Sequence, residues 1–353
     1  MPRLLECIPN FSEGQNQETL DLIAEAIRSV PDVKLLHVDQ GYSANRTVFT
    51  FAGEPEAVVE AAFQAIKVAS ERIDMSKHQG THPRMGATDV CPLVPISGIT
   101  FDEAAILAHH LGRRVGGELG IPVYMYEKTA SSLQRRNLAV IRAGEYEGFR
   151  EKILLEEWKP DYGPQTFHAK SGQTVIGVRD FLIAYNMNLN TRSVKLANAV
   201  AFDVREKGRV KTVDGKAGSE PLRDNHGKIV REPGLCKGVK AIGWYIEEFG
   251  AAQVSTNLTD ISATALHELF EATRNAARKR GLRVTGSELI GLIPERCLTE
   301  AGAFYLEMQG QSADVSKEEL VHIAVKTLGL AELSPFDPWE KILEWNLERR
   351  TEE

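Results

Sequence analysis

The densest group of reactive side chains lies in residues 77–89, KHQGTHPRMGATD, which hold two histidines and two cations. Histidine titrates near neutral pH, so it can take up and release a proton during a reaction. His78 and His82 have the spacing of the HExxH zinc motif, but that motif requires a helix and a glutamate after the first histidine. The QGT segment between the histidines and the proline after them exclude both. We therefore predict acid–base chemistry at His82, leave His78 open between a structural and a functional role, and expect no metal site.

Two further polar groups accompany this loop. Residues 39–46, DQGYSANR, are typical of a strand end followed by a turn, and residues 10–14, NFSEG, follow the first predicted strand. Asp39 could simply cap the turn, with Arg46 as its partner. However, loops that leave the same edge of one sheet converge, and loops carry catalytic groups more often than cores do. We therefore expect the loops at 39–46 and 77–89 to lie together.

Several common site signatures are absent from the sequence. It has no GxxxxGK[ST] phosphate-binding loop, no GxGxxG dinucleotide motif and no GxSxG nucleophile elbow. The cysteines, Cys7, Cys91, Cys236 and Cys297, are too far apart for a CxxC metal motif or a dense disulfide framework. Cys7 and Cys91 lie in apolar strand contexts, so we predict buried, inert thiols there.

Composition and charge narrow the class of protein further. The 353 residues suit roughly two domains, and 42% hydrophobic with 26% charged residues is ordinary for a globular protein. Lys and Arg total 42 and Asp and Glu 49, and the formal charge of −7 argues against a nucleic-acid partner. No apolar run reaches the roughly 18 residues of a membrane helix, and no secretory signal is seen. We expect a cytoplasmic protein without a membrane partner.

Alternation and helical spacing predict the elements that must position these residues. In the first half we expect strands at 4–9, 33–39, 46–52, 90–96 and 123–126, and helices at 18–30, 54–73 and 101–119. In the second half we expect strands at 181–189, 241–247, 251–257 and near Val284, and helices at 193–206 and 263–279. The order β-α-β-β-α-β therefore occurs in both halves, which is the split βαβ, ferredoxin-like arrangement.

The predicted fold class is α+β, with two ferredoxin-like subdomains, each a β-sheet covered by helices. The boundary is expected after the Pro/Gly-rich stretch KPDYGPQTFHAKSGQ, which gives subdomains 1–178 and 179–333. Residues 207–237 are polar, with five glycines and no hydrophobic period, and predict a long solvated excursion. Residues 334–353 are expected to form a C-terminal helix and tail, with the helix docked onto the body.

Six blocks of residues resemble the formiminotransferase family, and they occur in order between Leu5 and about residue 345. They are CIPNFSEG (7–14), NRTV (45–48), HPRMG (82–86), FLIAYN (181–186), QVSTN (253–257) and GLIP (291–294). In vertebrates this family forms the N-terminal half of formiminotransferase-cyclodeaminase. The resemblance implies two ferredoxin-like subdomains with a folate tunnel between them, and a homodimer.

The resemblance also implies a reaction and its residues. The formimino group passes from N-formimino-L-glutamate to N5 of tetrahydrofolate, in histidine degradation and one-carbon metabolism, with tetrahydrofolate as co-substrate and no metal required. The family's catalytic histidine falls on His82. A polar residue that is glutamine in the vertebrate proteins falls on Glu288, which we expect to bind substrate. The folate-binding stretch falls on Gly163, Pro164, Gln165, Thr166, Phe167, His168, Ala169, Lys170, Ser171 and Gly172.

The chemistry of the donor suggests further roles. The formimino group is an amidine, protonated near neutral pH, and a carboxylate is its natural partner through charge-assisted hydrogen bonds. Asp39 is the first candidate for this catalytic role and Glu13 the second. The two carboxylates of the donor require arginine or lysine, for which Arg46 and Arg84 are the candidates.

The folate and the other partners can be placed more coarsely. Lys170 could meet the folate tail, with or without a polyglutamate extension, and the pteridine is expected near Phe167 and Tyr185. The chain ends near residue 353, which leaves no room for a cyclodeaminase domain, so we expect a separate cyclodeaminase as partner.

Two other functions fit the same residues. One is formyl transfer between 5-formyltetrahydrofolate and glutamate, whose substrates share the same pteridine and glutamate parts. The other is folate binding without catalysis, against which the presence of His82, Asp39 and Arg84 together argues.

Overall fold

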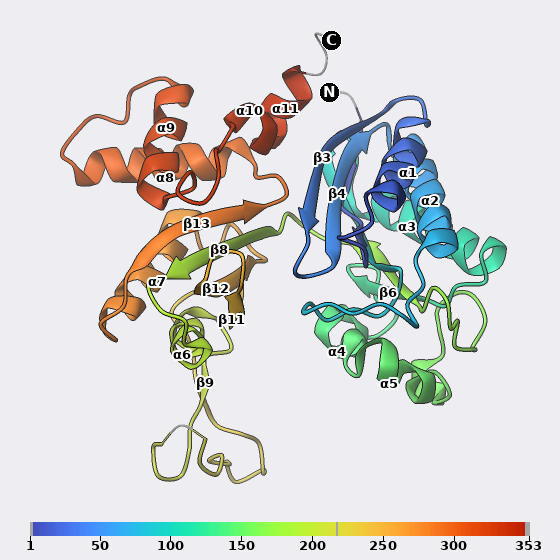
Figure 1. The fold of residues 1–353 in the computed structure, drawn as a ribbon, viewed down its shortest axis with the longest axis horizontal. Coiled ribbons are helices and arrows are strands. Elements are labelled where there is room, and N and C mark those ends of the chain that lie inside the picture. The colour runs from blue at the N-terminus through green and yellow to red at the C-terminus, as the bar shows by residue number, and fades with distance from the viewer. Residues whose placement is uncertain (1–2, 217, 350–353) are drawn as a thin grey trace. The chain divides into compact units, whose positions relative to one another are not determined.

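A computed structural model describes residues 3–216 and 218–349, which form two compact units that divide after Asp180 (Figure 1). Both units combine helices and β-strands, as the predicted α+β class requires. Each unit is built around one main β-sheet of its own.

The sheet of the first unit has seven strands. They are β1 (Leu4–Cys7), β2 (Asn10–Phe11), β3 (Val33–Gly41), β4 (Arg46–Gly53), β5 (Thr88–Ser97), β6 (Val123–Glu127) and β7 (Thr174–Val178). β1 and β2 both lie between β4 and β5 and pair antiparallel with each, while β3 pairs with β4. β7 and then β6 extend the sheet beyond β5 with parallel pairing.

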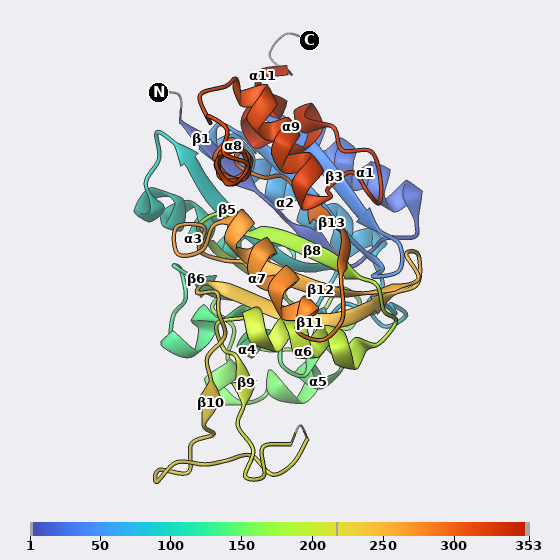
Figure 2. The ribbon, with the colours of Figure 1, turned by 90° about the vertical axis from the view of Figure 1, so that its left-hand side faces the viewer.

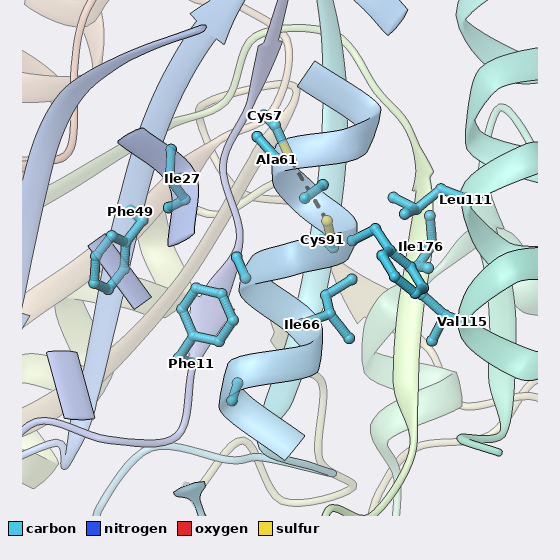
Figure 3. Close-up of a cluster of buried hydrophobic side chains, with 14 of the residues drawn as sticks. Cys7, Phe11, Ile27, Phe49, Ala61, Ile66, Cys91, Leu111, Val115 and Ile176 are labelled. Atoms are coloured by element: carbon cyan, nitrogen blue, oxygen red, sulfur yellow. Dashed lines mark hydrogen bonds between the residues drawn. The ribbon is translucent and has the colours of Figure 1, made fainter. Parts of the chain in front are cut away.

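Three long helices pack on one face of this sheet: α1 (Gln17–Arg28), α2 (Pro55–Arg72) and α3 (Phe101–Glu118). Asn16 caps α1 by accepting a hydrogen bond from the N–H of Thr19, and Thr100 and Glu103 form a capping box at the start of α3. The apolar stripes of the helices meet the strands in a core, of which Figure 3 shows Phe11, Phe49, Ile66, Leu111, Val115 and Ile176.

Cys7 and Cys91 lie inside this core on the neighbouring strands β1 and β5, and their sulfur atoms face each other (Figure 3). The two Sγ atoms are 3.5 Å apart, so the thiols are not joined. Burial raises the pKa of Cys7 well above its usual value. The prediction that both thiols are buried is confirmed.

A smaller core lies on the opposite face of the same sheet, because side chains alternate along a strand. There Val90, Tyr124 and Val175 cluster with Phe149 and Trp158. The covering segments are α4 (Leu138–Arg142), α5 (Glu145–Lys152) and the 3₁₀ turns Leu133–Arg136 and Glu156–Trp158. The sequence patterns predicted neither these short elements nor β7.

The second unit has a four-stranded antiparallel sheet in the order β11-β12-β8-β13. Its strands are β8 (Ile183–Leu189), β11 (Val239–Ile246), β12 (Ala251–Leu258) and β13 (Val284–Ile290). The helices α6 (Val194–Val204) and α7 (Leu266–Arg278) cover one face of this sheet (Figure 2).

Four helices that the sequence analysis did not delimit follow β13. They are α8 (Glu295–Met308), α9 (Lys317–Leu328), α10 (Pro338–Lys341) and α11 (Leu343–Arg349). Trp345 of α11 donates to Glu295, so the C-terminal helix docks as expected.

When the two-residue strands are set aside, the order β-α-β-β-α-β occurs in both units, as β1 α1 β3 β4 α2 β5 and as β8 α6 β11 β12 α7 β13. Within the stretch 207–237, the described residues carry only the two-residue strands β9 (Arg209–Val210) and β10 (Arg231–Glu232), in an arm that projects beyond α6 (Figure 2). Among residues 3–216 and 218–349, no helix combines the length and the apolar character needed to cross a lipid bilayer.

Candidate active site

His82 lies in the loop before β5, and it is half-buried. Its Nδ1 atom lies 2.7 Å from the carbonyl oxygen of Pro83, which can only accept, so Nδ1 donates. This hydrogen bond keeps the proton on Nδ1 and leaves the lone pair on Nε2. Burial, together with the charges of Arg46 and Arg142, lowers the pKa of His82 to about 3. The imidazole is therefore neutral at pH 7, as a proton acceptor must be.

Asp89 is the acidic centre of this region, and it is completely buried. Its Oδ1 atom accepts the N–H of Met85 at 2.9 Å. Its Oδ2 atom lies 2.7 Å from Nη1 of Arg46 and 2.6 Å from Nη2 of Arg142. Burial acts to raise the pKa of Asp89, but the charges of Arg142 and Arg46 outweigh burial and lower it. Asp89 is therefore ionised and holds two guanidinium groups on one oxygen.

A β-bulge re-aims the side chain at position 89. Val90 of β5 pairs with Asn10, but Thr88 pairs with Phe11, so Asp89 is the extra residue between them. An extra residue interrupts the alternation of a strand and changes the direction of its side chain. The bulge thus explains how a carboxylate at the start of a buried strand meets two arginines.

Arg46 and Arg142 reach this carboxylate from different elements. Arg46 is the first residue of β4, and its Nε donates to Oδ1 of Asn10 at 3.2 Å. Arg142 is the last residue of α4. Lys152 Nζ donates to three carbonyl oxygens at the end of that helix, at 3.1, 2.7 and 2.9 Å, which fixes the helix end that carries Arg142.

Hydrogen bonds bring together the polar groups that the sequence singles out. Ser12 Oγ donates to the carbonyl oxygen of Gly86 at 2.8 Å. Asn45 joins the other loops, because its Oδ1 accepts the N–H of Gly14 at 2.9 Å and its Nδ2 donates to the carbonyl of Gln79 at 2.8 Å. The expected convergence of these loops is confirmed.

The segment Gly163–Gly172 lies against the loop of His82. Gly172 and Gly86 form an isolated antiparallel bridge, and the N–H of Ala87 donates to the carbonyl of Ser171 at 2.7 Å. Within the segment, Nδ1 of His168 accepts from the N–H of Ser171 at 3.1 Å. The exposed residues of the segment are Gly163, Pro164, Thr166, Ala169 and Lys170.

Side chains of this segment also hold it to its neighbours. Gln165 Nε2 donates to the carbonyl of residue 153 at 3.1 Å. The ring of Phe167 packs beside Tyr146, with centroids 5.1 Å apart, and the guanidinium of Arg150 lies 5.2 Å from the Phe167 centroid. Lys170 Nζ donates to the carbonyl of residue 71 at 2.5 Å, at the end of α2.

Arg84 is neutralised by the protein itself. It donates to the two oxygens of Glu147 at 2.8 and 2.6 Å and to Glu145 at 3.2 Å. Its Nε donates to Nδ1 of His78 at 3.2 Å, and Nε2 of His78 lies 2.9 Å from the carbonyl of Asn45. Both ring nitrogens of His78 are therefore engaged, which indicates a structural role. Across the described residues, no three His, Cys, Asp or Glu side chains are grouped to hold a metal ion.

Asp39 lies on β3, and its Oδ2 atom is 3.5 Å from Nε2 of His37 on the same strand. It pairs directly with Val48 of β4. Because Arg46 lies two residues before Val48, the alternation of side chains puts Asp39 and Arg46 on the same face of the sheet.

Glu13 shapes the turn before α1. Its Oε1 atom accepts the N–H groups of Gln15 and Asn16 at 2.8 and 2.9 Å. A hollow of about 610 Å³ opens beside this turn, and its lining includes Glu13, Lys77 and His78. One oxygen of the Glu13 carboxylate thus already accepts two backbone hydrogen bonds.

Glu288 belongs to β13 of the second unit and sits in a polar network. Its Oε1 atom accepts from Nε2 of Gln253 at 3.0 Å and from Nδ2 of Asn186 at 3.1 Å. Oε1 of Gln253 in turn accepts from the indole N–H of Trp244 at 2.8 Å. An amide oxygen at position 288 would accept the same two donors, so glutamine and glutamate are interchangeable in this network.

Tyr185 is completely buried in the core of the second unit. Its hydroxyl donates to Oγ of Ser287 at 2.9 Å. The buried ring offers no exposed surface of its own to a pteridine, and the expectation of a pteridine near Phe167 and Tyr185 stays a prediction.

Comparison with known proteins identifies the chain. The N-terminal subdomain of the formiminotransferase domain matches residues 4–179, and the formiminotransferase domain matches residues 184–348. The glutamate formimidoyltransferase of Streptococcus pyogenes serotype M1 is 41% identical over 309 residues, which cover 88% of this chain and 95% of that protein. The chain belongs to the formiminotransferase family.

Other relatives within the formiminotransferase family differ in length. The glutamate formimidoyltransferase of Thermoplasma acidophilum is 40% identical over 87% of this chain and 93% of that protein. The formimidoyltransferase-cyclodeaminase of Mus musculus is 46% identical over 98% of this chain, and the matched part spans 60% of that protein. Among solved structures, a microcompartment protein from Desulfitobacterium hafniense aligns with a TM-score of 0.21 and 11% identity, over 82% of this chain and 94% of that chain. These values are too low to indicate a shared fold.

Sequence reasoning missed two residues of this candidate site. Asp89 lay within the polar group at 77–89, but its position at the start of a strand gave no sign of the bulge. Arg142 lies in a short helix that the hydrophobic pattern did not predict. The only available signal was a cation directly after the buried Ile141.

Proposed function

We propose that the chain transfers the formimino group from N-formimino-L-glutamate to N5 of tetrahydrofolate, giving 5-formiminotetrahydrofolate and L-glutamate. The names of the S. pyogenes and T. acidophilum relatives support this reaction over formyl transfer. The observation that carries the proposal is a neutral His82, with the lone pair of Nε2 available, beside the buried charges of Asp89, Arg46 and Arg142.

His82 serves as the proton carrier of this reaction. N5 attacks the formimino carbon, an N5–C bond forms, and Nε2 accepts the proton that N5 loses. The imidazolium then gives this proton to the glutamate nitrogen while the bond from that nitrogen to the formimino carbon breaks. One proton moves from N5 to the leaving nitrogen, so His82 returns to its neutral form. Catalysis of this kind contributes roughly 10²- to 10⁴-fold, and it needs tetrahydrofolate as co-substrate and no metal.

Carboxylates and cations of the first unit bind the donor in this proposal. Asp39 faces the protonated amidine, with Glu13 as the second candidate, whose carboxylate already serves a turn. Arg46 binds a carboxylate of the donor. Arg84 is the weaker candidate for that role, because Glu147 and a second glutamate already compensate its charge.

Residues Gly163–Gly172 bind tetrahydrofolate in this proposal. The ring of Phe167 supplies an apolar surface, and Lys170 lies on the exposed side of the segment, where the tail carboxylates of folate can meet an ammonium group. Glu288 contacts substrate from its own network of amides.

The resemblance supplies the remaining predictions. The two units correspond to ferredoxin-like formiminotransferase subdomains at 1–178 and 179–333, with a helix and tail at 334–353, and a ligand tunnel lies between them. The protein is a cytoplasmic homodimer in histidine degradation, and a separate cyclodeaminase processes its product. Sedimentation that gives a monomer at micromolar concentration would overturn the homodimer.

The test of the reaction is direct. Protein, formiminoglutamate and tetrahydrofolate are mixed, quenched in acid, and the near-UV absorbance of methenyltetrahydrofolate is read. We expect a signal that the His82→Ala variant lacks. A signal only with 5-formyltetrahydrofolate and glutamate would favour formyl transfer. Tetrahydrofolate binding by calorimetry without turnover of either donor would favour a binding protein.

A further inference from the structure

We propose that Arg142 and Arg46 together bind the α-carboxylate of the amino-acid donor, with Asp89 holding the two guanidinium groups in place. This inference rests on the proposed function and deepens it. It adds Arg142 as a substrate-binding residue and assigns one carboxylate of the donor to one pair of side chains.

The charges around Asp89 do not balance. One carboxylate meets two guanidinium groups on the same oxygen, at 2.6 and 2.7 Å, which leaves one positive charge in surplus. Across residues 3–216 and 218–349, Asp89 is the only acidic side chain that pairs with Arg46 or Arg142. The group is largely removed from water, because Asp89 is 0% exposed, Arg46 is 8% exposed, and the side chain of Arg142 is 16% exposed. A buried charge without a partner is costly, so an anion completes this group.

Two other buried arginines of this chain have acidic partners of their own. Arg84 has two glutamate partners of its own. Arg135 has Asp161 at 3.0 Å and donates to the carbonyl oxygens of residues 157 and 159 at 3.0 and 2.7 Å. Neither leaves a surplus of positive charge, which distinguishes them from the pair at Asp89.

Arg142 also has a buried N–H donor without an acceptor among the described residues. Its Nη2 is used by Asp89, but its Nε–H is buried and has no acceptor among the described residues. Buried donors in proteins are nearly always paired, so an acceptor atom of a ligand is expected at this position. The planar guanidinium matches the two oxygens of a carboxylate better than any other side chain.

The position of Arg46 and Arg142 indicates which anion they bind. His82 belongs to the same loop as Met85, whose N–H donates to Asp89 Oδ1 at 2.9 Å, and the charges of Arg46 and Arg142 act on His82. The anion site therefore lies beside the group that moves the proton. In the donor, the α-carboxylate is attached to the carbon whose nitrogen releases the formimino group. In tetrahydrofolate, the tail carboxylates lie at the far end of the molecule from N5. The anion next to His82 is therefore the α-carboxylate of the donor.

The experiment compares Arg142→Gln with Arg136→Gln, which removes the same charge from an exposed neighbouring position. We expect Arg142→Gln to raise the KM for formiminoglutamate at least tenfold and to leave the Kd for tetrahydrofolate within twofold, with Arg136→Gln unchanged. In Arg142→Lys, the increase in log KM for formiminoglutamate should be more than half of the increase in Arg142→Gln. The reason is that an ammonium group cannot reproduce the paired N–H groups of a guanidinium. Thermal melting of each variant verifies that it is folded.

Product binding tests the same site without turnover. Calorimetry with L-glutamate, its α-amide and its γ-amide should show that the parent protein loses affinity at least tenfold for the α-amide alone. In Arg142→Gln, the difference in affinity between L-glutamate and its α-amide should shrink to a few-fold, because only Arg46 remains to bind the α-carboxylate. If the parent turns over formiminoglutamate but Arg142→Gln keeps both KM and L-glutamate affinity within twofold, the arginine site is wrong and the reaction stands. If the parent shows no turnover yet discriminates the α-amide as expected, the reaction fails and the arginine site stands. Equal binding of both amides by the parent overturns the site.

Discussion

Gly86 and Gly172 face each other in an isolated antiparallel bridge, which joins the loop of His82 to the last residue of the candidate folate segment. A Cβ on Gly86 would lie 2.1 Å from the carbonyl oxygen of Gln173. A Cβ on Gly172, whose φ is +66°, would lie 2.3 Å from the carbonyl of Met85. Backbone therefore meets backbone at this point, and neither position has room for a side chain.

We expect Gly86→Ala to separate these two segments. The added methyl group forces the backbone apart, at a cost of about 1–3 kcal/mol in the free energy of unfolding, and raises the Kd for tetrahydrofolate. Urea unfolding and calorimetry measure the two effects. Gly148→Ala is the control, because its Cβ meets nothing within 4 Å in α5 and the change should stabilise by up to about 1 kcal/mol. Equal stability of both variants would contradict the close approach.

His82→Ala should lower kcat by roughly 10²- to 10⁴-fold while tetrahydrofolate still binds, because the proposed proton carrier is lost and the candidate folate segment is untouched. Steady-state kinetics and calorimetry check this prediction. His110→Ala, at an exposed position of α3, should leave kcat unchanged. Turnover of the His82 variant within a few-fold of the parent would remove His82 from the mechanism.

The low pKa of His82 makes stability depend on pH. Burial and the charges of Arg46 and Arg142 lower the pKa to about 3 in the folded protein, against a usual value of 6.5. Between these values the unfolded chain binds a proton that the folded protein does not, so stability falls as pH falls. From pH 7 to 5.5 the parent should lose about 1 kcal/mol more than His82→Gln, as measured by urea unfolding. Parallel losses in both proteins would show that His82 is not the group responsible.

Asp89→Asn should destabilise the protein by about 3–5 kcal/mol, because two buried guanidinium groups lose their shared carboxylate. The second change Arg142→Gln, added to Asp89→Asn, should then recover part of the loss by removing one of the two unpaired charges. A double-mutant cycle of unfolding free energies measures this coupling. Simple additivity of the two changes would mean that the charges do not interact.

Glu288→Gln should keep stability and activity within a few-fold, because the amide oxygen accepts from Gln253 and Asn186 as the carboxylate does. Glu288→Ala should cost about 1–3 kcal/mol, since both buried amides lose an acceptor. Unfolding by urea separates the two variants. A large loss with glutamine would show that the negative charge itself is required.

Local patterns were sufficient to predict most of the elements and the loops that carry the site. The alternation at 46–52 and the helical spacing at 18–30 correspond to β4 and α1, which differ from the prediction only at their ends. The polar loops at 39–46 and 77–89 meet through Asn45, as their position at one sheet edge required. The role of residues 163–172 came from the resemblance, because nothing in their composition indicates folate.

The features that the sequence did not predict depend on contacts between segments that lie far apart in the chain. The prediction that Arg84 binds substrate rested on residue type, which cannot reveal that Glu145 and Glu147 lie within reach of it. Tyr185 belongs to a strand, and alternation does not tell which face of a strand is covered. Asp89 meets Arg142 only because a bulge turns it. These are relations between segments, and local periodicity does not record them.

The place of β7 in the sheet has a consequence for how the chain is made. β7 is the last strand of the first unit, yet it lies between β5 and β6, and within the described chain it is the only strand that pairs with β6. During synthesis from the N-terminus, β6 leaves the ribosome before its partner strand exists, so its pairing with a neighbouring strand waits for residues 174–178. The candidate folate segment directly precedes β7, and the ribosome must therefore complete it before the sheet of the first unit can close.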